Sequence, residues 1–211
     1  MFTGIVAAVG RIDAVTPIDG DADSGVRVRI AAPELDLSDV AIGDSIAIQG
    51  ACMTVVAKVG NSFDVDISRE SLNKTIGLDA PGEVNLEKAM RPHDRLGGHM
   101  VSGHVDGLGT VTHFAPVGES HELRILAPAE LGKYLAYKGS ITVNGVSLTV
   151  NRVTDQADGC EFSINLIPHT VAVTTLRHLQ AGSRVNLEID LIARYVERML
   201  SAPPTLHCAE Q

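Results

Sequence analysis

The chain has 211 residues, which is enough for two domains of about 100 residues each. Apolar residues make up 45% of the sequence and charged residues 20%, a composition that argues against disordered and fibrous proteins. The net charge is −9, from 17 Lys and Arg against 26 Asp and Glu, so the chain lacks the basic character of a nucleic-acid-binding protein.

Membrane and export signals are also missing from the sequence. No apolar run reaches the roughly 18 residues of a membrane span, and residues 1–6 lack the basic region and long apolar core of a signal peptide. Cys52, Cys160 and Cys208 are too few and too scattered for a disulfide framework or a zinc site. We therefore expect a cytoplasmic protein that contacts neither nucleic acid nor a membrane.

The regular elements predicted along the chain are mostly strands. Apolar and polar residues alternate in residues 26–30, 63–67 and 185–189, as they do in half-buried antiparallel strands. Short helical turns are predicted after Pro33 and Pro128, because proline suits the first position of a helix. Strands of this length and spacing favour a small Greek-key barrel.

An internal repeat organises the chain, with an offset between 95 and 101 residues that changes in small steps, as loop insertions would cause. The matching segments are 3–6 with 102–105, 45–46 with 140–141, 54–55 with 149–150, and 84–87 with 185–188. Two copies are too few for a solenoid, so we interpret the repeat as a duplicated domain. The copies are assigned to residues 1–97 and 98–189, joined by a linker at 88–98.

The end of the chain is predicted to be helical. Leu191, Ile192, Tyr195, Val196, Met199 and Leu200 would form one apolar face of a helix that ends before Pro203. A helix of about ten residues is marginal alone, so it must pack on its own barrel or on another subunit. The subunit contact is favoured because no such helix follows the first copy. Residues 202–211 are predicted to be a flexible tail.

Each copy contains a polar pair within an otherwise apolar strand. The pairs are Cys52 with Thr54, and Ser147 with Thr149. Residues two apart on a strand share a face, so each pair would present two hydrogen-bonding groups side by side. Either these residues are ordinary strand and core residues, or they mark two related sites, one with a thiol and one with a hydroxyl.

The segment 97–105 is rich in glycine and contains His99 and His104. Two histidines five apart face opposite sides of a strand, and no cysteine or carboxylate completes a ligand set, so a metal site is not expected. A neutral histidine beside flexible backbone can serve as a general base near pH 7; the alternative is a hydrogen-bonded turn histidine.

Taken together, five stretches of the sequence resemble riboflavin synthase of the α-chain type. They are residues 1–6, 97–105, 138–150, 166–170 and 185–190, and the resemblance covers residues 1 to about 200. It implies an all-β fold of two tandem six-stranded Greek-key barrels followed by a C-terminal α-helix at 190–201 that forms a homotrimer.

The resemblance also implies an enzyme of riboflavin biosynthesis. Two molecules of 6,7-dimethyl-8-ribityllumazine would dismutate to riboflavin and 5-amino-6-(D-ribitylamino)uracil, with no metal or other cofactor. Both substrates would bind in an active site between the first barrel of one subunit and the second barrel of its neighbour. An association with lumazine synthase is left open.

Carried onto this chain, the resemblance implies two pockets. The first would be lined by Gly4, Ile5, Val6, Ser45, Cys52, Met53, Thr54, Asp66, Ile67, Ser68, Arg69, Glu70 and Ser71. The second would be lined by Gly103, His104, Val105, Lys138, Ser147, Leu148, Thr149, Asn165, Leu166, Ile167, Pro168, His169 and Thr170.

The catalytic candidates come from both pockets. They are His104, Cys52, Ser147, Thr149, Lys138, Asp190 and Ser45. His104 is the first candidate for proton transfer, Ser147 and Thr149 would orient the ring, and Cys52 would act as a thiolate nucleophile or shape the pocket.

The sequence departs from the family pattern in or near the first copy. Gln49-Gly50 stands where Asn-Gly is frequent, Ser71 where Thr is usual, and Ser68 where Met is common. The main alternative is a non-catalytic lumazine-binding antenna protein of the same fold, and the other is a purely structural duplicated barrel. The intact Thr3-Gly4 opening and residues 98–104 favour the enzyme.

Overall fold

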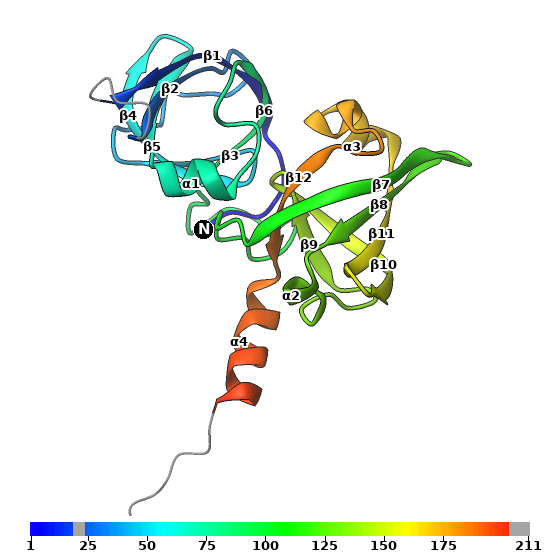
Figure 1. Cartoon of the computed structure of the whole chain (residues 1–211). Coiled ribbons are helices and arrows are strands. Elements are labelled where there is room, and N and C mark those ends of the chain that lie inside the picture. The colour runs from blue at the N-terminus through cyan, green and yellow to red at the C-terminus, as the bar shows by residue number, and fades with distance from the viewer. Residues whose placement is uncertain (19–23, 203–211) are drawn as a thin grey trace, which may run out of the picture.

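The computed structural model describes residues 1–18 and 24–202, which form two closed six-stranded antiparallel barrels and a C-terminal helix (Figure 1). The first barrel consists of β1 (Ala8–Pro17), β2 (Val26–Ala31), β3 (Ser45–Ile48), β4 (Ala51–Val59), β5 (Ser62–Ile67) and β6 (Gly82–Lys88), with α1 (Arg69–Lys74) between the last two. The second consists of β7 (Gly107–Val117), β8 (Ser120–Ala127), β9 (Ser140–Val143), β10 (Val146–Gln156), β11 (Gly159–Leu166) and β12 (Arg184–Ile189). The short helices α2 (Ala129–Gly132), α3 (Pro168–Ala172) and η2 (Thr175–His178) accompany the second barrel.

Both barrels have the same strand order. In the first, β1-β2-β5-β4-β3-β6 closes on itself, and the second repeats this order from β7 to β12. Strands β3, β4 and β5 are consecutive hairpin partners and β2 lies beside β5, which is a Greek key. The predicted fold class, two Greek-key barrels from a duplication, is therefore confirmed.

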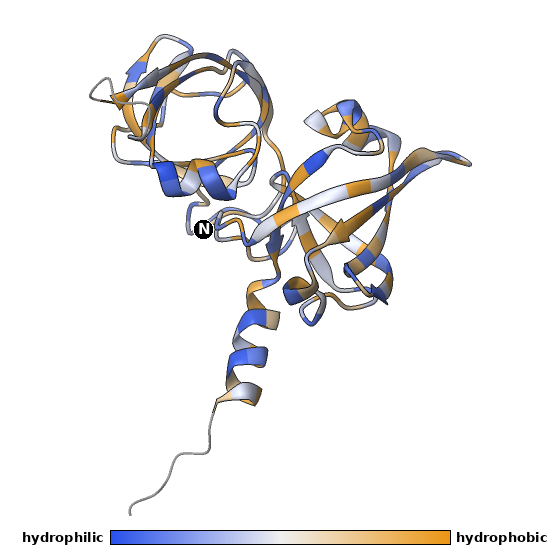
Figure 2. Cartoon of the chain, in the orientation of Figure 1, coloured by the Kyte–Doolittle hydropathy of each residue, from blue (hydrophilic) through white to orange (hydrophobic). Residues whose placement is uncertain are grey.

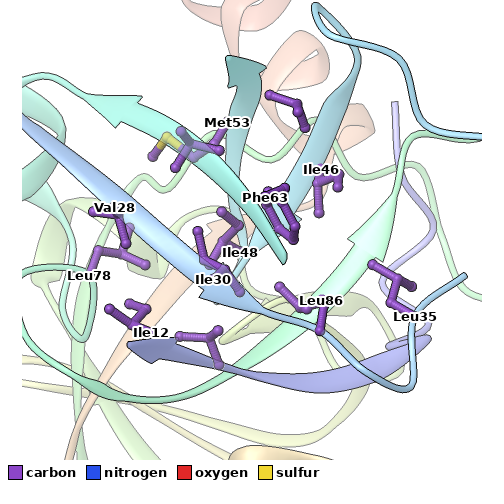
Figure 3. Packing of buried hydrophobic residues seen from close by; sticks show 14 of the residues in the cluster. Ile12, Val28, Ile30, Leu35, Ile46, Ile48, Met53, Phe63, Leu78 and Leu86 are labelled. Carbon is purple, nitrogen blue, oxygen red and sulfur yellow. The ribbon is translucent and has the colours of Figure 1, made fainter. Parts of the chain in front are cut away.

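Each barrel encloses its own hydrophobic core. In the first, Phe63 is fully buried among side chains from several strands, Ile30, Ile46, Ile48 and Leu86 among them (Figure 3). Phe162, the counterpart of Phe63 in the repeat, is fully buried in the second core. Burying a side chain of this size contributes about 1.5–3 kcal/mol, so each barrel has an independent source of stability.

Only one of the two predicted helical turns is a helix. Helix α2 follows Pro128, whereas Pro33 is followed by a turn in which the Leu35 N–H donates to the Ala32 carbonyl over 3.2 Å. Leu35 and Leu37 both bury their side chains in the first core. Residues two apart face nearly opposite sides of a helix, so packing both of them excludes a helix there.

The two copies meet through equivalent parts of the repeat. The β3–β4 hairpin turns at Gln49-Gly50 and the β9–β10 hairpin at Asn144-Gly145, and all four residues have positive φ, as a type I′ turn requires. A Cβ added to Gly50 would lie 2.7 Å from the Gly145 nitrogen, so the two turns touch. Only glycine permits this approach.

Strands β6 and β12 are buried on both faces. Asn85, Glu87, Asn186 and Glu188 occupy the polar positions of the alternation, yet their exposures are 2%, 8%, 2% and 3%. The prediction of a half-buried strand at 185–189 was therefore wrong, whereas β2 does alternate between buried and exposed positions.

The second faces of β6 and β12 are buried by contacts between the two copies. The Asn85 side-chain amide donates to the Asn144 carbonyl over 2.8 Å, and that of Asn186 donates to the Gln49 carbonyl over 2.9 Å. A single-strand pattern does not distinguish a solvent-exposed face from one that is covered by another domain.

The last helix, α4 (Leu191–Ser201), extends away from both barrels (Figure 1). Asp190 caps it by accepting the Ile192 N–H over 2.9 Å. Its polar side is tied to the second barrel by the Arg194–Asp106 and Lys133–Glu197 ion pairs. Tyr195, Met199 and Leu200 are 62%, 78% and 82% exposed, so the predicted helix is confirmed and its apolar face does not pack on its own barrel.

The hydropathy of the chain agrees with this arrangement of barrels and helix. Hydrophobic and hydrophilic residues are interspersed along the strands, and α4 carries both kinds (Figure 2). Within residues 1–18 and 24–202, no helix is long and apolar enough to cross a membrane. Apart from Ala202, the predicted tail lies outside the described residues.

Candidate functional site

The polar pairs lie on the outer surfaces of the barrels. On β4, Met53 faces the first core while Cys52 is half-buried and Thr54 is exposed. On β10, Leu148 faces the second core while Ser147 is half-buried and Thr149 is exposed. Each pair thus presents its two polar groups on one face, and the two faces are equivalent in the repeat.

The first member of each pair, Cys52 or Ser147, is covered by a segment that belongs to the other copy. The Cys52 N–H donates to the Gly103 carbonyl over 2.7 Å, and the Ser147 N–H donates to the Gly4 carbonyl over 2.7 Å. Val105 packs against the core of the first barrel and Val6 against that of the second. The segment before each barrel thus packs on the other barrel, and we call the two of them the exchanged segments.

The predicted grouping of the pockets was therefore wrong. Residues 4–6 lie against the second barrel and residues 103–105 against the first. The crossing is fixed by Phe2 and Val101, which are buried and bonded to each other by reciprocal backbone hydrogen bonds of 2.7 and 3.1 Å. The repeat aligns each segment with its own copy and contains no information on which barrel it covers.

Two buried carboxylates hold the crossing segments. Glu87 accepts the Thr3 N–H and hydroxyl over 2.7 Å each, and the Gly4 N–H over 2.9 Å. Glu188 accepts the Ser102 N–H over 2.7 Å, its hydroxyl over 2.6 Å, and the Gly103 N–H over 3.0 Å. Burial raises the pKa of both carboxyls against the effect of these hydrogen bonds. Sequence reasoning missed both residues, although they end the repeated segments 84–87 and 185–188.

The Cys52 face opens into a cavity of about 190 Å³. Its walls come from β4, from α1 and from the exchanged segment, and they include Cys52, Met53, Glu70, Ser71, Gly103, His104 and Val105. His104 is exposed, and within the described residues of its own chain it makes no hydrogen bond. A thiol, an imidazole and the end of a short helix therefore meet at one surface.

Other residues predicted for the first pocket have different neighbours. Asp66 forms a bidentate ion pair with Arg27, with N–O distances of 2.7 and 2.8 Å. Ser68 caps α1, and the Arg69 side chain donates to the Ser24 carbonyl. Ile67 is buried in the core and Thr54 is exposed beside β3.

Ser45 lines a separate cavity of about 580 Å³. Charged groups in its wall already pair with one another, since Asp39 binds both Lys88 and Arg91. This cavity is larger than the one at Cys52, but it lacks the paired polar face. The structure therefore does not bring Ser45 to the Cys52 cavity.

The Ser147 face contains a half-buried hydrogen-bonded pair, His99 and Ser147. His99 Nδ1 lies 2.7 Å from Ser147 Oγ, and His99 Nε2 lies 3.3 Å from Thr142 Oγ1. The His99 N–H also donates to the Thr3 carbonyl over 3.1 Å. Burial lowers the pKa of His99 while the Asp190 carboxylate acts in the opposite direction, so the ring is neutral at neutral pH and can accept a hydrogen bond from the Ser147 hydroxyl. The sequence identified the segment that contains His99, but His104 was the residue predicted for proton transfer.

The remaining candidates belong to the second copy and to the start of α4. Residues Pro168, His169 and Thr170 belong to α3, which occupies the position of α1 in the repeat. The Asn165 side chain accepts the Ser120 hydroxyl proton over 2.8 Å, Leu166 is buried, and Ile167 is exposed. Lys138 donates to the Asn151 side chain over 2.9 Å, and Asp190 caps α4.

The lowered pKa of His99 gives a prediction for stability. An ordinary histidine has a pKa of about 6.5, so below that pH the unfolded chain binds a proton that folded His99 binds less readily. His99 should therefore reduce the free energy of unfolding as the pH falls through this value, and contribute nothing above it. Urea unfolding of the wild type and His99→Gln, at roughly pH 7.5 and pH 5.5, tests this. The wild type should lose more stability than the variant between the two pH values, and equal losses would contradict the assignment.

Comparison with known proteins agrees with this architecture. A family model described as "Lumazine binding domain" matches residues 3–89 and again residues 102–190. The riboflavin synthase of Photobacterium phosphoreum is 48% identical over 202 residues, covering 95% of this chain and 89% of that protein. The riboflavin synthase of Mycobacterium bovis is 43% identical over 204 residues, covering 95% and 98%.

Solved structures share the fold at lower identity. A crystal structure of LumP complexed with riboflavin has a TM-score of 0.76 and 30% identity, covering 90% of this chain and 99% of LumP. LumP complexed with 6,7-dimethyl-8-(1'-D-ribityl) lumazine gives 0.75 and 29%, covering 89% and 98%. The identity to the enzymes is higher than that to LumP and extends through both barrels, and the chain belongs to the riboflavin synthase family.

Proposed function

We propose that the chain converts two molecules of 6,7-dimethyl-8-ribityllumazine into riboflavin and 5-amino-6-(D-ribitylamino)uracil by transferring a four-carbon unit. The atoms of the two substrates equal those of the two products, so the reaction needs no external oxidant or reductant. One observation carries the proposal: two equivalent polar faces with different chemistry, Cys52 with His104 and Ser147 with His99. Identical reactants with different roles need related but unequal binding surfaces.

The main contribution of such surfaces is positioning. Holding two lumazines in contact makes an encounter of dilute reactants effectively intramolecular, which can contribute about 7–11 kcal/mol to lowering the barrier. LumP, which shares this fold, has been crystallised with the lumazine and with riboflavin. These complexes support the same ligands for the barrels of this chain.

We place the reaction between the first barrel of one subunit and the second barrel of its neighbour in a homotrimer. The cavity at Cys52, about 190 Å³, lies below the roughly 300–1,000 Å³ of a site that encloses a ligand of this size. A second wall from a neighbouring subunit would complete it. The exposed apolar face of α4 offers a contact for that neighbour.

The chemical step needs a proton removed from the 7-methyl group of one lumazine. The resulting anion is delocalised into the electron-poor ring, so a modest base suffices. His104 lies at the open Cys52 cavity, whereas neutral His99 polarises the Ser147 hydroxyl. Cys52 packs beside Phe2 and Val101, a position that supports a role in shaping the pocket.

Replacing His104 with alanine should lower kcat by about 100-fold or more, since general acid–base catalysis contributes about 10²- to 10⁴-fold. The dissociation constant for the lumazine should change little. Single-turnover kinetics and fluorescence titration measure the two quantities, and His93→Ala serves as a control at an exposed histidine of the connection between the barrels. Equal losses of binding and turnover would make His104 a binding residue.

Incubating the purified, metal-chelated protein with 6,7-dimethyl-8-ribityllumazine alone tests the proposed reaction. Riboflavin and the ribitylaminouracil should form in equal amounts, one of each per two lumazines consumed. Tight binding without turnover would favour an antenna protein instead. Cytoplasmic location and an association with lumazine synthase stay predictions, to be measured by fractionation and co-sedimentation.

A further inference from the structure

The two buried carboxylates stand at equivalent places in the repeat, outside both polar faces. Each uses both of its oxygens to accept three hydrogen bonds from one crossing segment, two from a Thr or Ser and one from the glycine that follows. Charge-assisted hydrogen bonds of this kind are short and geometrically demanding. The three hydrogen bonds of Glu87 and the three of Glu188 differ in length by no more than 0.1 Å from one copy to the other.

The segments that they hold reach directly to the groups of the proposed reaction. From Glu87 the connection runs through Thr3, whose carbonyl accepts the His99 N–H, and through Gly4, whose carbonyl accepts the Ser147 N–H. From Glu188 it runs through Gly103, whose carbonyl accepts the Cys52 N–H and which is followed by His104. Hydrogen bonds therefore connect each carboxylate to the polar face of the opposite barrel.

We propose that Glu87 and Glu188 are positioning residues for the reaction, with Glu87 setting the His99–Ser147 pair and Glu188 setting the Cys52–His104 surface. Ionised carboxylates suit this role because all four of their lone-pair sites accept, and three N–H or O–H groups point at each of them. Burial raises the pKa of both carboxyls, and the hydrogen bonds from the crossing segments act in the opposite direction.

Glutamine is the informative substitution at both positions. Its volume is similar, but one of its two terminal groups donates and would face an N–H or O–H donor, so one contact is lost and one repulsion appears. We expect kcat to fall by about 10- to 100-fold in Glu87→Gln and in Glu188→Gln, with little change in KM. Glu83→Gln, an exposed glutamate of β6 bonded to Arg177 and His178, is the matched control and should keep its activity.

Two readouts separate positioning from general destabilisation and do not depend on turnover. Alkylation of Cys52 by iodoacetamide, followed by peptide mapping, should accelerate several-fold in Glu188→Gln and stay unchanged in Glu87→Gln; buried Cys160 is the internal standard. The imidazole ¹⁵N signals of His99 should shift in Glu87→Gln and stay unchanged in Glu188→Gln. This crossed pattern confirms the inference.

Equal changes of both readouts in both variants would mean a structural role only and overturn the inference, as would full activity in both. If either glutamine variant fails to fold, Thr3→Ala and Ser102→Ala remove one hydroxyl contact each and should give the same crossed pattern with smaller changes. The kinetic part rests on the proposed function, whereas the crossed pattern does not. If the wild type makes no riboflavin but the two variants show the crossed pattern, the proposed reaction is rejected and the two positioning roles are kept.

Discussion

Replacing Gly103 with alanine is expected to reduce kcat/KM by about 100-fold. Gly103 has a φ of +79°, in the left-handed region that costs other residues about 1–2 kcal/mol. A Cβ at this position would also lie 2.6 Å from the Cys52 Cβ and 2.9 Å from a ring carbon of Phe2. Both distances are shorter than the contacts that real Cβ atoms make. Residues 103–105 must therefore move away from β4, and His104 moves with them.

Gly77→Ala is the matched control for this substitution. Gly77 has the same φ of +79°, but nothing lies within 4 Å of its added Cβ. It therefore carries the backbone strain without the collision. Thermal unfolding should show a small loss in Gly77→Ala and a larger one in Gly103→Ala, and only the latter should lose activity. Similar losses in both variants would show that the close approach to Cys52 does not matter for the reaction.

The fold could be predicted from the sequence because its signals are local or repeated. Alternation marks strands such as β2, the offset matches mark the duplication, and the apolar residues from Leu191 to Leu200 mark α4. The resemblance to riboflavin synthase supplied the count of six strands. The helix expected after Pro33 failed because burial of Leu35 and Leu37 in the core overrides the local preference for a helical turn.

The candidate site was predicted only in part, for a different reason. Cys52, Ser147 and His104 stand where the polar pairs and the glycine-rich segment indicated. The exchange of residues 4–6 and 103–105 between barrels is a long-range property, which depends on the Phe2–Val101 pairing and has no signal in either segment alone. Glu87 and Glu188 are buried by the crossing segments, residues 3–4 and 102–103, which lie far away in the sequence, so the strand patterns gave no sign of their burial.

Deleting residues 191–201 is expected to convert the proposed trimer into monomers and to lower activity by at least about 100-fold. Helix α4 makes its contacts within the chain through polar groups, Arg194 to Asp106 and Glu197 to Lys133, and leaves its apolar face outside. Each side chain on that face that moves from water into a helix contact contributes about 1.5–3 kcal/mol. Sedimentation velocity and the lumazine assay measure the two effects.

A double substitution tests the same contact without shortening the chain. Val196→Asp with Met199→Asp places two charges on the apolar face, where burial in a subunit contact would be costly. Arg198→Ala on the same helix lies outside the apolar face and should keep both assembly and activity. The barrels of the double variant should stay folded, because no residue of α4 is buried in either core. Loss of the trimer and of activity together would locate the reaction at the contact between subunits, whereas an active monomer would place both lumazines on one chain.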